Sequence, residues 1–187
     1  MKQYLLMEKR MLKLYFVSVI LLFGFVINGD NFTTVYAFTN NYKQQKDDNK
    51  KAPDFTLKDT DGNEVTLSDY KGKIIILDFW ATWCGPCRMS IPDLISIQSE
   101  YKDNLVIIGI SLDDGRTQDN VKPFMNSVGI NYPVVFGTMD VVIDYGNIYA
   151  IPTSFIIDQS GNIVKSHIGL VPKEIIEGEI DSLLGKT

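Results

Sequence analysis

The segment FWATWCGPC, residues 79–87, decides the fold of this chain. It completes the run IIILDFW at 74–80, which predicts a strand covered on both faces. Pro86 suits the first turn of a helix, because the N–H that proline lacks needs no partner there. The segment therefore predicts a strand that turns directly into a helix, with Cys84 and Cys87 at the helix start.

Cys84 and Cys87 are the only cysteines of the chain. A structural disulfide is a poor explanation for them, because so short a loop constrains the unfolded chain little. A zinc site would need two further ligands, and the chain has a single histidine. Thiol–disulfide exchange needs an attacking thiolate and a second thiol that resolves the mixed disulfide. We predict Cys84 as the exposed attacker, stabilised by the helix N-terminus, and Cys87 as the buried resolving thiol.

The rest of the chain predicts helices that alternate with buried strands, followed by a hairpin and a helix. The expected elements are a hairpin at 55–67, strands at 105–112 and 133–136, helices at 117–128 and 140–147, a hairpin at 153–168 and a helix at 174–184. The last helix should turn five apolar residues inward, namely Ile175, Ile176, Ile180, Leu183 and Leu184. This order predicts an α/β sandwich around a mixed sheet.

The N-terminus carries an uncharged apolar run, LYFVSVILLFGFVI at 14–27, behind a basic flank. This pattern is typical of a secretory signal, and Val35 and Ala37 suit a cleavage after Ala37. An uncleaved membrane anchor is the alternative for residues 1–37, although the run is short for a bilayer span. Residues 38–52 are polar and predict a solvated linker, and residues 53–187 predict the folded domain.

Charge excludes one class of partner. Removal of residues 1–37 takes away four basic and two acidic residues, which leaves 14 basic and 21 acidic residues and a formal charge of −7. An acidic domain is repelled by phosphate backbones, so we expect no nucleic-acid partner. We also expect no cofactor or metal, and contact with a membrane only through the leader.

Residues 79–87, taken together with 53–57, 109–113 and 151–158, resemble the exported, AhpC/TSA-related thioredoxin-like proteins of the TlpA/ResA group. The resemblance covers about residues 53–185. It implies a thioredoxin-like three-layer α/β/α sandwich with a mixed central sheet, an N-terminal hairpin extension and an insertion at 113–147. It also implies a cis peptide bond between Ile151 and Pro152, where the backbone pairs with an extended substrate.

Asp78 interrupts the apolar strand that leads to the cysteines. A carboxyl buried there has a raised pKa and can exchange a proton near neutrality. It stands at the place of the buried acid of thioredoxin, where many TlpA/ResA members have Asn. We hypothesise that Asp78 accepts the proton of Cys87 during resolution. A solvated Asp at a sheet edge is the alternative.

Gly85 and Pro86, between the cysteines, are the dipeptide of thioredoxin, whereas strongly oxidising relatives place a His there. The resemblance therefore implies a reductant of disulfides in exported proteins, apocytochrome c among the candidates, which receives electrons from a CcdA- or DsbD-like membrane protein. Trp83 should border the substrate groove and Trp80 pack in the core. Arg88 and His167 are expected to face solvent.

Three other functions are considered. A peroxiredoxin-like peroxidase would need a Thr three residues before its reactive cysteine, where this chain has Ala81. A copper-delivery protein of the Sco type would use a wider CxxxC spacing and a placed His. A non-catalytic thioredoxin-like binding module would not need the intact pair Cys84 and Cys87.

Overall fold

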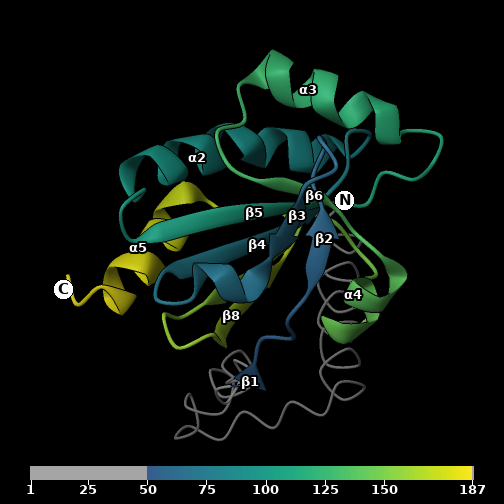
Figure 1. The fold of residues 1–187 in the computed structure, drawn as a ribbon. Coiled ribbons are helices and arrows are strands. Elements are labelled where there is room, and N and C mark those ends of the chain that lie inside the picture. Colours follow the sequence, from purple (N-terminus) through teal and green to yellow (C-terminus); the bar gives the residue numbers. More distant parts are fainter. Residues whose placement is uncertain (1–49, 187) are drawn as a thin grey trace, which may run out of the picture. The chain divides into compact units, whose positions relative to one another are not determined.

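The computed structural model describes residues 50–186. The predicted leader at 1–37 and most of the predicted linker at 38–52 lie outside the described residues, so these remain predictions. Within residues 50–186 no helix is both long and apolar enough to cross a membrane. The described part is built on a six-stranded sheet with the strand order β1-β8-β7-β4-β5-β6 (Figure 1). Its strands are β1 (Lys50–Lys51), β4 (Ile74–Trp80), β5 (Leu105–Ser111), β6 (Val134–Phe136), β7 (Thr153–Ile157) and β8 (Asn162–Ile168).

The sheet is mixed, as predicted, and β4 lies at its centre. β4 pairs parallel with β5 on one side and antiparallel with β7 on the other. β6 continues the parallel part beside β5, while β8 continues the antiparallel part beside β7. The register places Asp78 of β4 opposite Gly109 of β5 and Ser154 of β7.

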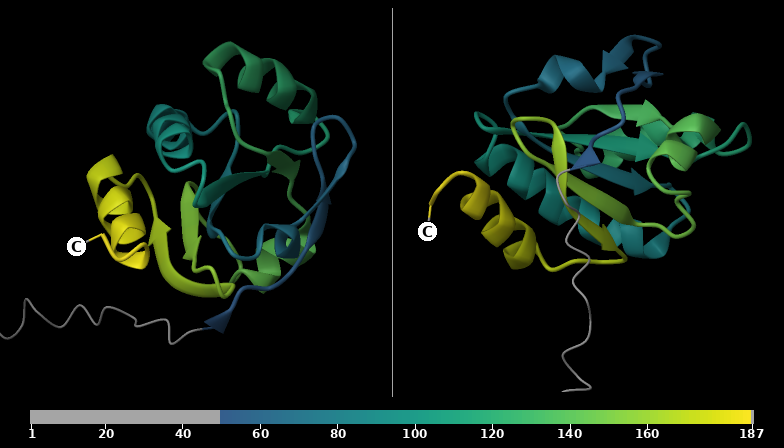
Figure 2. Two further views of the ribbon diagram at one scale, coloured as in Figure 1. Left: turned by 60° about the vertical axis from the view of Figure 1, so that its left-hand side comes forward. Right: turned by 90° about the horizontal axis from the view of Figure 1, so that it is seen from below.

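Helices cover both faces of the sheet and make the three layers of an α/β/α sandwich (Figure 2). One face carries α2 (Gly85–Glu100), α3 (Val121–Val128) and α5 (Lys173–Leu183). The other carries α4 (Met139–Asp144), the 3-10 helix η1 (Leu67–Tyr70) and the hairpin of β2 (Thr56–Lys58) and β3 (Glu64–Thr66). The thioredoxin-like sandwich with its N-terminal hairpin is therefore confirmed.

β4 divides its side chains between two cores. Ile74, Ile76 and Trp80 face the layer of α2 and α5, and Ile75, Leu77 and Phe79 face the layer of α4. All six are buried, and each contributes about 1.5–3 kcal/mol by leaving water. This double burial explains why the strand is an unbroken apolar run except at Asp78.

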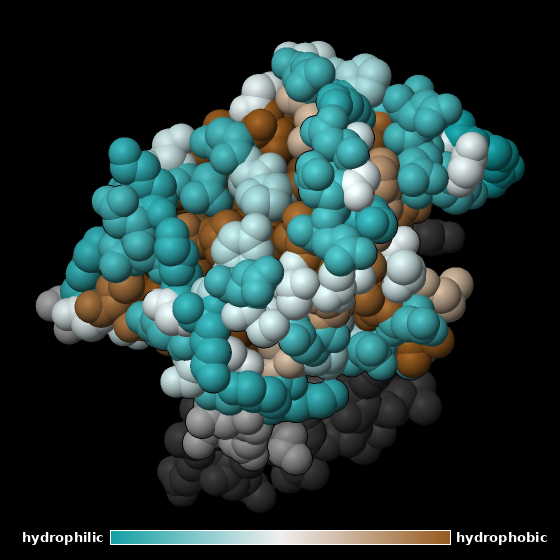
Figure 3. All heavy atoms as spheres, in the orientation of Figure 1, coloured by the Kyte–Doolittle hydropathy of each residue, from teal (hydrophilic) through white to brown (hydrophobic). Residues whose placement is uncertain are grey.

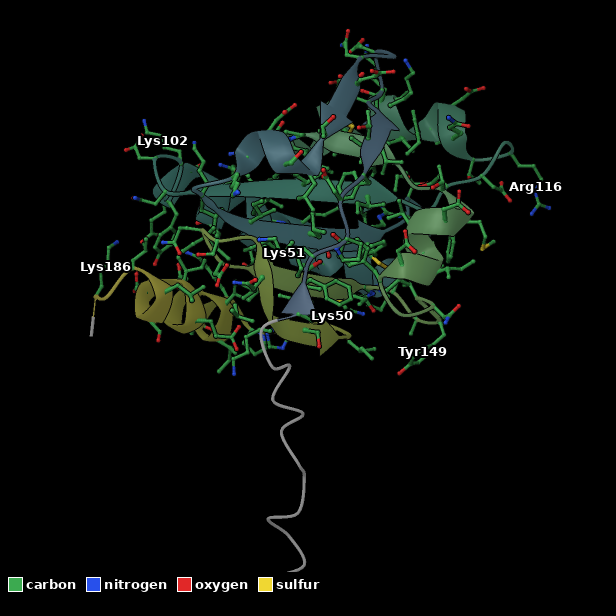
Figure 4. All side chains as sticks on the ribbon, turned by 60° about the horizontal axis from the view of Figure 1, so that its bottom comes forward. Lys50, Lys51, Lys102, Arg116, Tyr149 and Lys186 are labelled. Carbon is green, nitrogen blue, oxygen red and sulfur yellow. A yellow bond between two sulfur atoms is a disulfide. The ribbon has the colours of Figure 1, made fainter. Side chains whose placement is uncertain are left out.

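β1 lies within the predicted linker at 38–52 and belongs to the central sheet. The backbones of Lys50 and Lys51, labelled in Figure 4, pair antiparallel with Ile163 and Asn162 of β8. The Ala52 N–H adds a hydrogen bond of 3.0 Å to the Gly161 carbonyl. Backbone pairing along the edge of a sheet does not require apolar side chains, so polar composition alone suggested a linker here.

Some smaller expectations differ from the structure. The segment predicted as a helix at 117–128 starts with a 3-10 turn, η2 (Gln118–Asn120), before α3, and α4 ends at Asp144 rather than at residue 147. On α5, Ile176 and Ile180 are buried as predicted, but Ile175 is 51% exposed. The His167 side chain does not face open solvent, because its Nε2 lies 2.9 Å from Glu179 Oε2 of α5.

Candidate active site

Cys84 and Cys87 form a disulfide at the N-terminus of α2, with an S–S distance of 2.07 Å. Cys84 is the N-cap residue of the helix, and its Sγ accepts a hydrogen bond of 3.2 Å from the Cys87 N–H. Cys87 is fully buried, whereas Cys84 keeps 5% of its surface exposed. The strand-to-helix turn predicted from the sequence is therefore present. Both cysteines are buried, and Cys84, predicted as the exposed one, is only slightly more accessible than Cys87.

A loop from the far end of the chain meets the disulfide. The Ile151–Pro152 peptide bond is cis, as the resemblance implied. The carbonyl oxygen of Ile151 lies 3.7 Å from Cys84 Sγ. Hydrogen bonds hold the loop on both sides, from the Thr153 hydroxyl to the Ala150 carbonyl at 2.7 Å and from the Gly169 N–H to the Pro152 carbonyl at 2.7 Å. The loop thus presents a fixed backbone edge next to the cysteine pair.

Apolar side chains are exposed around the disulfide. Trp83, directly before Cys84, is 62% exposed, and Gly85 and Pro86 are exposed as well. Tyr149, two residues before Ile151, projects from the domain, at the end opposite Lys102 and Lys186 (Figure 4). A separate group of hydrophobic residues reaches the surface over α4, where Met139 and Ile143 are exposed (Figure 3).

Asp78 is a buried carboxyl on the same face of β4 as Trp80, which packs in one cluster with Cys84 and Cys87. It is 3% exposed, and its Oδ2 has no hydrogen-bond partner. Burial disfavours the charged form and raises the pKa of Asp78 to about 7. The carboxyl therefore can exchange a proton near neutral pH. It is buried, so the alternative of a solvated Asp at a sheet edge is wrong.

Gly109 makes room for the indole of Trp80 above β5. A Cβ atom on Gly109 would lie 2.9 Å from Trp80 Nε1, closer than a carbon atom tolerates. Trp80 is buried, as expected, and its ring stacks at a tilt on Phe124 of α3, with 5.6 Å between centroids. The Arg88 guanidinium also lies over the Phe124 ring, 5.5 Å from its centroid. Arg88 is exposed, as expected. Its contact with Phe124 also connects α2 with α3.

Sequence reasoning missed a cluster of polar side chains around Asp113. The Asp113 carboxylate accepts hydrogen bonds from the Thr82 N–H at 2.8 Å, the Thr82 hydroxyl at 2.6 Å and the Ser111 hydroxyl at 2.9 Å. Asp113 and Ser111 are both buried. A signal for this cluster existed, because parallel β4 and β5 end at the same edge of the sheet and polar residues follow or close each strand.

No metal centre accompanies the cysteines in the described residues 50–186, where no three His, Cys, Asp or Glu side chains gather to hold an ion. On this sandwich, a cysteine pair lies at the start of a helix, next to the carbonyl that precedes a cis-proline. This is the arrangement of thioredoxin-like thiol–disulfide oxidoreductases, and the protein is one of them.

Comparison with known proteins gives the family. Residues 49–166 match the model of the AhpC/TSA family, and the chain belongs to this family. It is 34% identical to the thioredoxin-like protein YneN of Bacillus subtilis over 133 residues, which are 71% of this chain and 78% of YneN. It is also 34% identical to the thiol-disulfide oxidoreductase ResA of Bacillus anthracis over 171 residues, 91% of this chain and 96% of ResA.

A solved structure agrees with these relatives. The chain is similar to a putative thiol:disulfide interchange protein DsbE from Chlorobium tepidum, with a TM-score of 0.67 and 37% sequence identity. The match covers 73% of this chain and 97% of the DsbE chain. The matched proteins are thus covered over most of their length, and they share the fold that carries the cysteine pair.

Proposed function

We propose that this protein works outside the cytoplasm as a reductant of disulfide bonds in other exported proteins. The observation that carries the proposal is the Cys84–Cys87 pair at the start of α2, with only Gly85 and Pro86 between the two sulfurs. A His between the cysteines would stabilise the thiolate and make the pair oxidising. Its place is taken here by the small, uncharged Gly-Pro, which supports a pair that gives electrons away.

The exchange begins with the reduced pair. The Cys84 thiolate attacks one sulfur of the client disulfide, so that the client S–S bond breaks and a mixed disulfide with Cys84 forms. The other client sulfur leaves in this first step as a thiolate. The Cys87 thiol then loses its proton and attacks Cys84 Sγ, so that the bond between Cys84 and the client breaks and the attacked client sulfur is released. Two electrons pass from the cysteine pair to the client, whose two sulfurs take up the proton that Cys87 loses and one proton from solvent, and the pair ends as the disulfide of the structure.

Asp78 is the proposed acceptor of the Cys87 proton. Its location behind the cysteines, its burial and its unpartnered Oδ2 support this role. A pKa of about 7 lets the carboxyl take a proton in one step and release it in the next. The acid therefore serves the second, resolving step rather than the first attack.

Client binding is proposed at the surface around the disulfide. The exposed Trp83 would border the groove, with Gly85 and Pro86 forming its floor at the helix start. The backbone of Ile151, beside the cis Pro152, would pair with an extended client segment, because its carbonyl already lies 3.7 Å from the attacking sulfur. Such pairing uses hydrogen bonds to the client backbone rather than contacts with its side chains, so clients of differing sequence can bind.

The proposed compartment and partners are supported by the predicted leader and by the relatives. A signal peptide or anchor at residues 1–37 would bring the domain outside the cytoplasm. A reductant there needs electrons from a membrane protein of the CcdA or DsbD type. The relatives named thiol-disulfide oxidoreductase ResA and thiol:disulfide interchange protein DsbE support cysteine-containing substrates. The proposed clients are exported proteins with cysteine pairs, apocytochrome c among them.

Reduction of insulin by the protein with dithiothreitol as electron source tests the proposal. We expect turnover with the wild type and none with Cys84→Ser, because the attacking sulfur is then absent. Peroxide should not be consumed, since Ala81 occupies the position where a peroxidase needs Thr. Failure to reduce insulin, or faster consumption of peroxide than of insulin disulfides, would overturn the proposal in favour of a binding module or a peroxidase.

A further inference from the structure

Asp113, directly beyond the end of β5, is a buried carboxylate that the proposed exchange does not use. It is 7% exposed, and three donors converge on its two oxygens. Thr82 supplies two of them, its N–H at 2.8 Å and its hydroxyl at 2.6 Å. The Ser111 hydroxyl supplies the third at 2.9 Å, and its oxygen accepts the Asp113 N–H at 3.2 Å in return. The carboxylate is thereby fixed from β5 and directed at the turn before Cys84.

The turn at 81–84 connects the last residue of β4 to the nucleophile. The Cys84 N–H closes it by a hydrogen bond of 3.1 Å to the Ala81 carbonyl. Ala81 offers only a methyl group, and the Trp83 side chain is 62% exposed. The polar contacts that fix the middle of the turn to the domain therefore come through Thr82. Hydrogen bonds to a charged acceptor are short and strong, and the 2.6 Å bond is of this kind.

We propose that Asp113 is a positioning residue for the nucleophile: supported by Ser111, it holds Thr82 and so keeps Cys84 at the N-cap of α2, against the Cys87 N–H and the Ile151 carbonyl. The inference rests on the proposed function, because Cys84 is taken as the attacking sulfur. Asp113 touches no reacting atom and acts only through Thr82.

The contacts predict which step depends on the Asp113 clamp, meaning the hydrogen bonds of Asp113 with Thr82 and Ser111. Cys84 Sγ accepts the Cys87 N–H at 3.2 Å, and this contact stabilises a thiolate only while Cys84 stays at the N-cap. A loosened turn should therefore reduce the thiolate fraction of Cys84 and slow its attack. Binding of the client should change little, because the exposed Trp83 side chain and the backbone of the half-buried Ile151 form no hydrogen bond with Asp113.

Two substitutions at Thr82 separate geometry from charge. Thr82→Val keeps the shape and the N–H but removes the hydroxyl donor, whereas Thr82→Ser keeps both donors. Neither changes the net charge, so any effect on Cys84 arises from the loosened turn. Asp113→Ala removes the whole clamp, and Asp114→Asn is the matched control, because the exposed carboxyl of Asp114 forms its hydrogen bonds within its own turn, to Arg116 and to the Thr117 backbone.

The experiment measures two properties of each reduced variant: insulin reduction, with kcat and KM separated, and the pH profile of Cys84 alkylation by iodoacetamide, with the site identified by peptide mapping. For Thr82→Val we expect kcat to fall about tenfold at unchanged KM, which is about 1.4 kcal/mol of lost transition-state stabilisation. The midpoint of the alkylation profile should move to higher pH. Thr82→Ser and Asp114→Asn should behave as the wild type.

A wild-type alkylation profile and a wild-type kcat in Thr82→Val would overturn the proposal, even if Asp113→Ala is unstable. So would an equal loss in Thr82→Ser, because the hydroxyl would then not be the contact that matters. If the wild type itself fails to reduce insulin, the proposed function fails. The alkylation profiles still decide whether Asp113 positions Cys84, so the two failures are distinguishable.

Discussion

Replacing Asp78 by Asn should change how stability depends on pH. Burial raises the Asp78 pKa from 3.8 to about 7 in the folded protein. The folded protein therefore binds the Asp78 proton more tightly than the unfolded chain does. The contribution of this proton to the free energy of unfolding is complete below pH 3.8 and is lost as the pH rises through about 7. Each unit of pKa corresponds to 1.36 kcal/mol, so ionisation of the buried carboxyl lowers the free energy of unfolding by about 4 kcal/mol once the pH is well above 7. About 2–3 kcal/mol of this loss falls in the interval from about pH 5 to about pH 8.

Asn resembles the protonated acid in shape and carries no charge. Its NH₂ group would replace an oxygen with no partner, and this cost of about 1–3 kcal/mol does not vary with pH. The test is urea unfolding of the oxidised protein at about pH 5 and at about pH 8. The free energy of unfolding of the wild type should fall by about 2–3 kcal/mol more than that of Asp78→Asn on going from about pH 5 to about pH 8. The exposed Asp103→Asn is the control and should follow the wild type. Parallel pH curves for wild type and Asp78→Asn would refute a buried acid with a raised pKa.

Two further predictions follow from the site. Cys87→Ala should accumulate client proteins linked to Cys84 by a disulfide, because the resolving thiol is missing. These adducts should appear on a non-reducing gel as bands that dithiothreitol removes. The absence of such bands in a strain that exports the protein would contradict the scheme. Gly109→Ala should lower the free energy of unfolding by about 1–3 kcal/mol, because its Cβ would lie 2.9 Å from the buried indole of Trp80. Gly178→Ala on α5, where nothing lies within 4 Å, should leave stability equal or higher, and equal losses in both variants would show that crowding at Trp80 is not the cause.

The sequence predicted the centre of the fold well. The bounds of β4 agree at residues 74–80, because a strand buried on both faces must be apolar at every position and so stands out from its surroundings. The helix start at Gly85 was predictable from Pro86 and the cysteines. The cis bond before Pro152 came from the family resemblance alone, since a proline in a loop is trans by default.

Other features depend on contacts that no local pattern contains. Asp113 and Thr82 are 31 residues apart, and only the parallel pairing of β4 with β5 brings them together. The pairing of Lys50 and Lys51 with β8 uses backbone groups that every sequence possesses. Ile175 lies at the margin of the apolar stripe of α5, so the 3.6-residue period alone could not decide between core and solvent.

The reduction potential of the Cys84–Cys87 pair tests the central claim most directly. It is measured by equilibrating the protein with glutathione or dithiothreitol buffers and following the fraction of oxidised protein. A protein that gives electrons to client disulfides should have a potential nearer that of thioredoxin, about −270 mV, than that of DsbA, about −120 mV. A value of about −200 mV or lower is the predicted result, because Gly85 and Pro86 lack the histidine of oxidising pairs. A value near that of DsbA would contradict a reductant and indicate a protein that introduces disulfides instead.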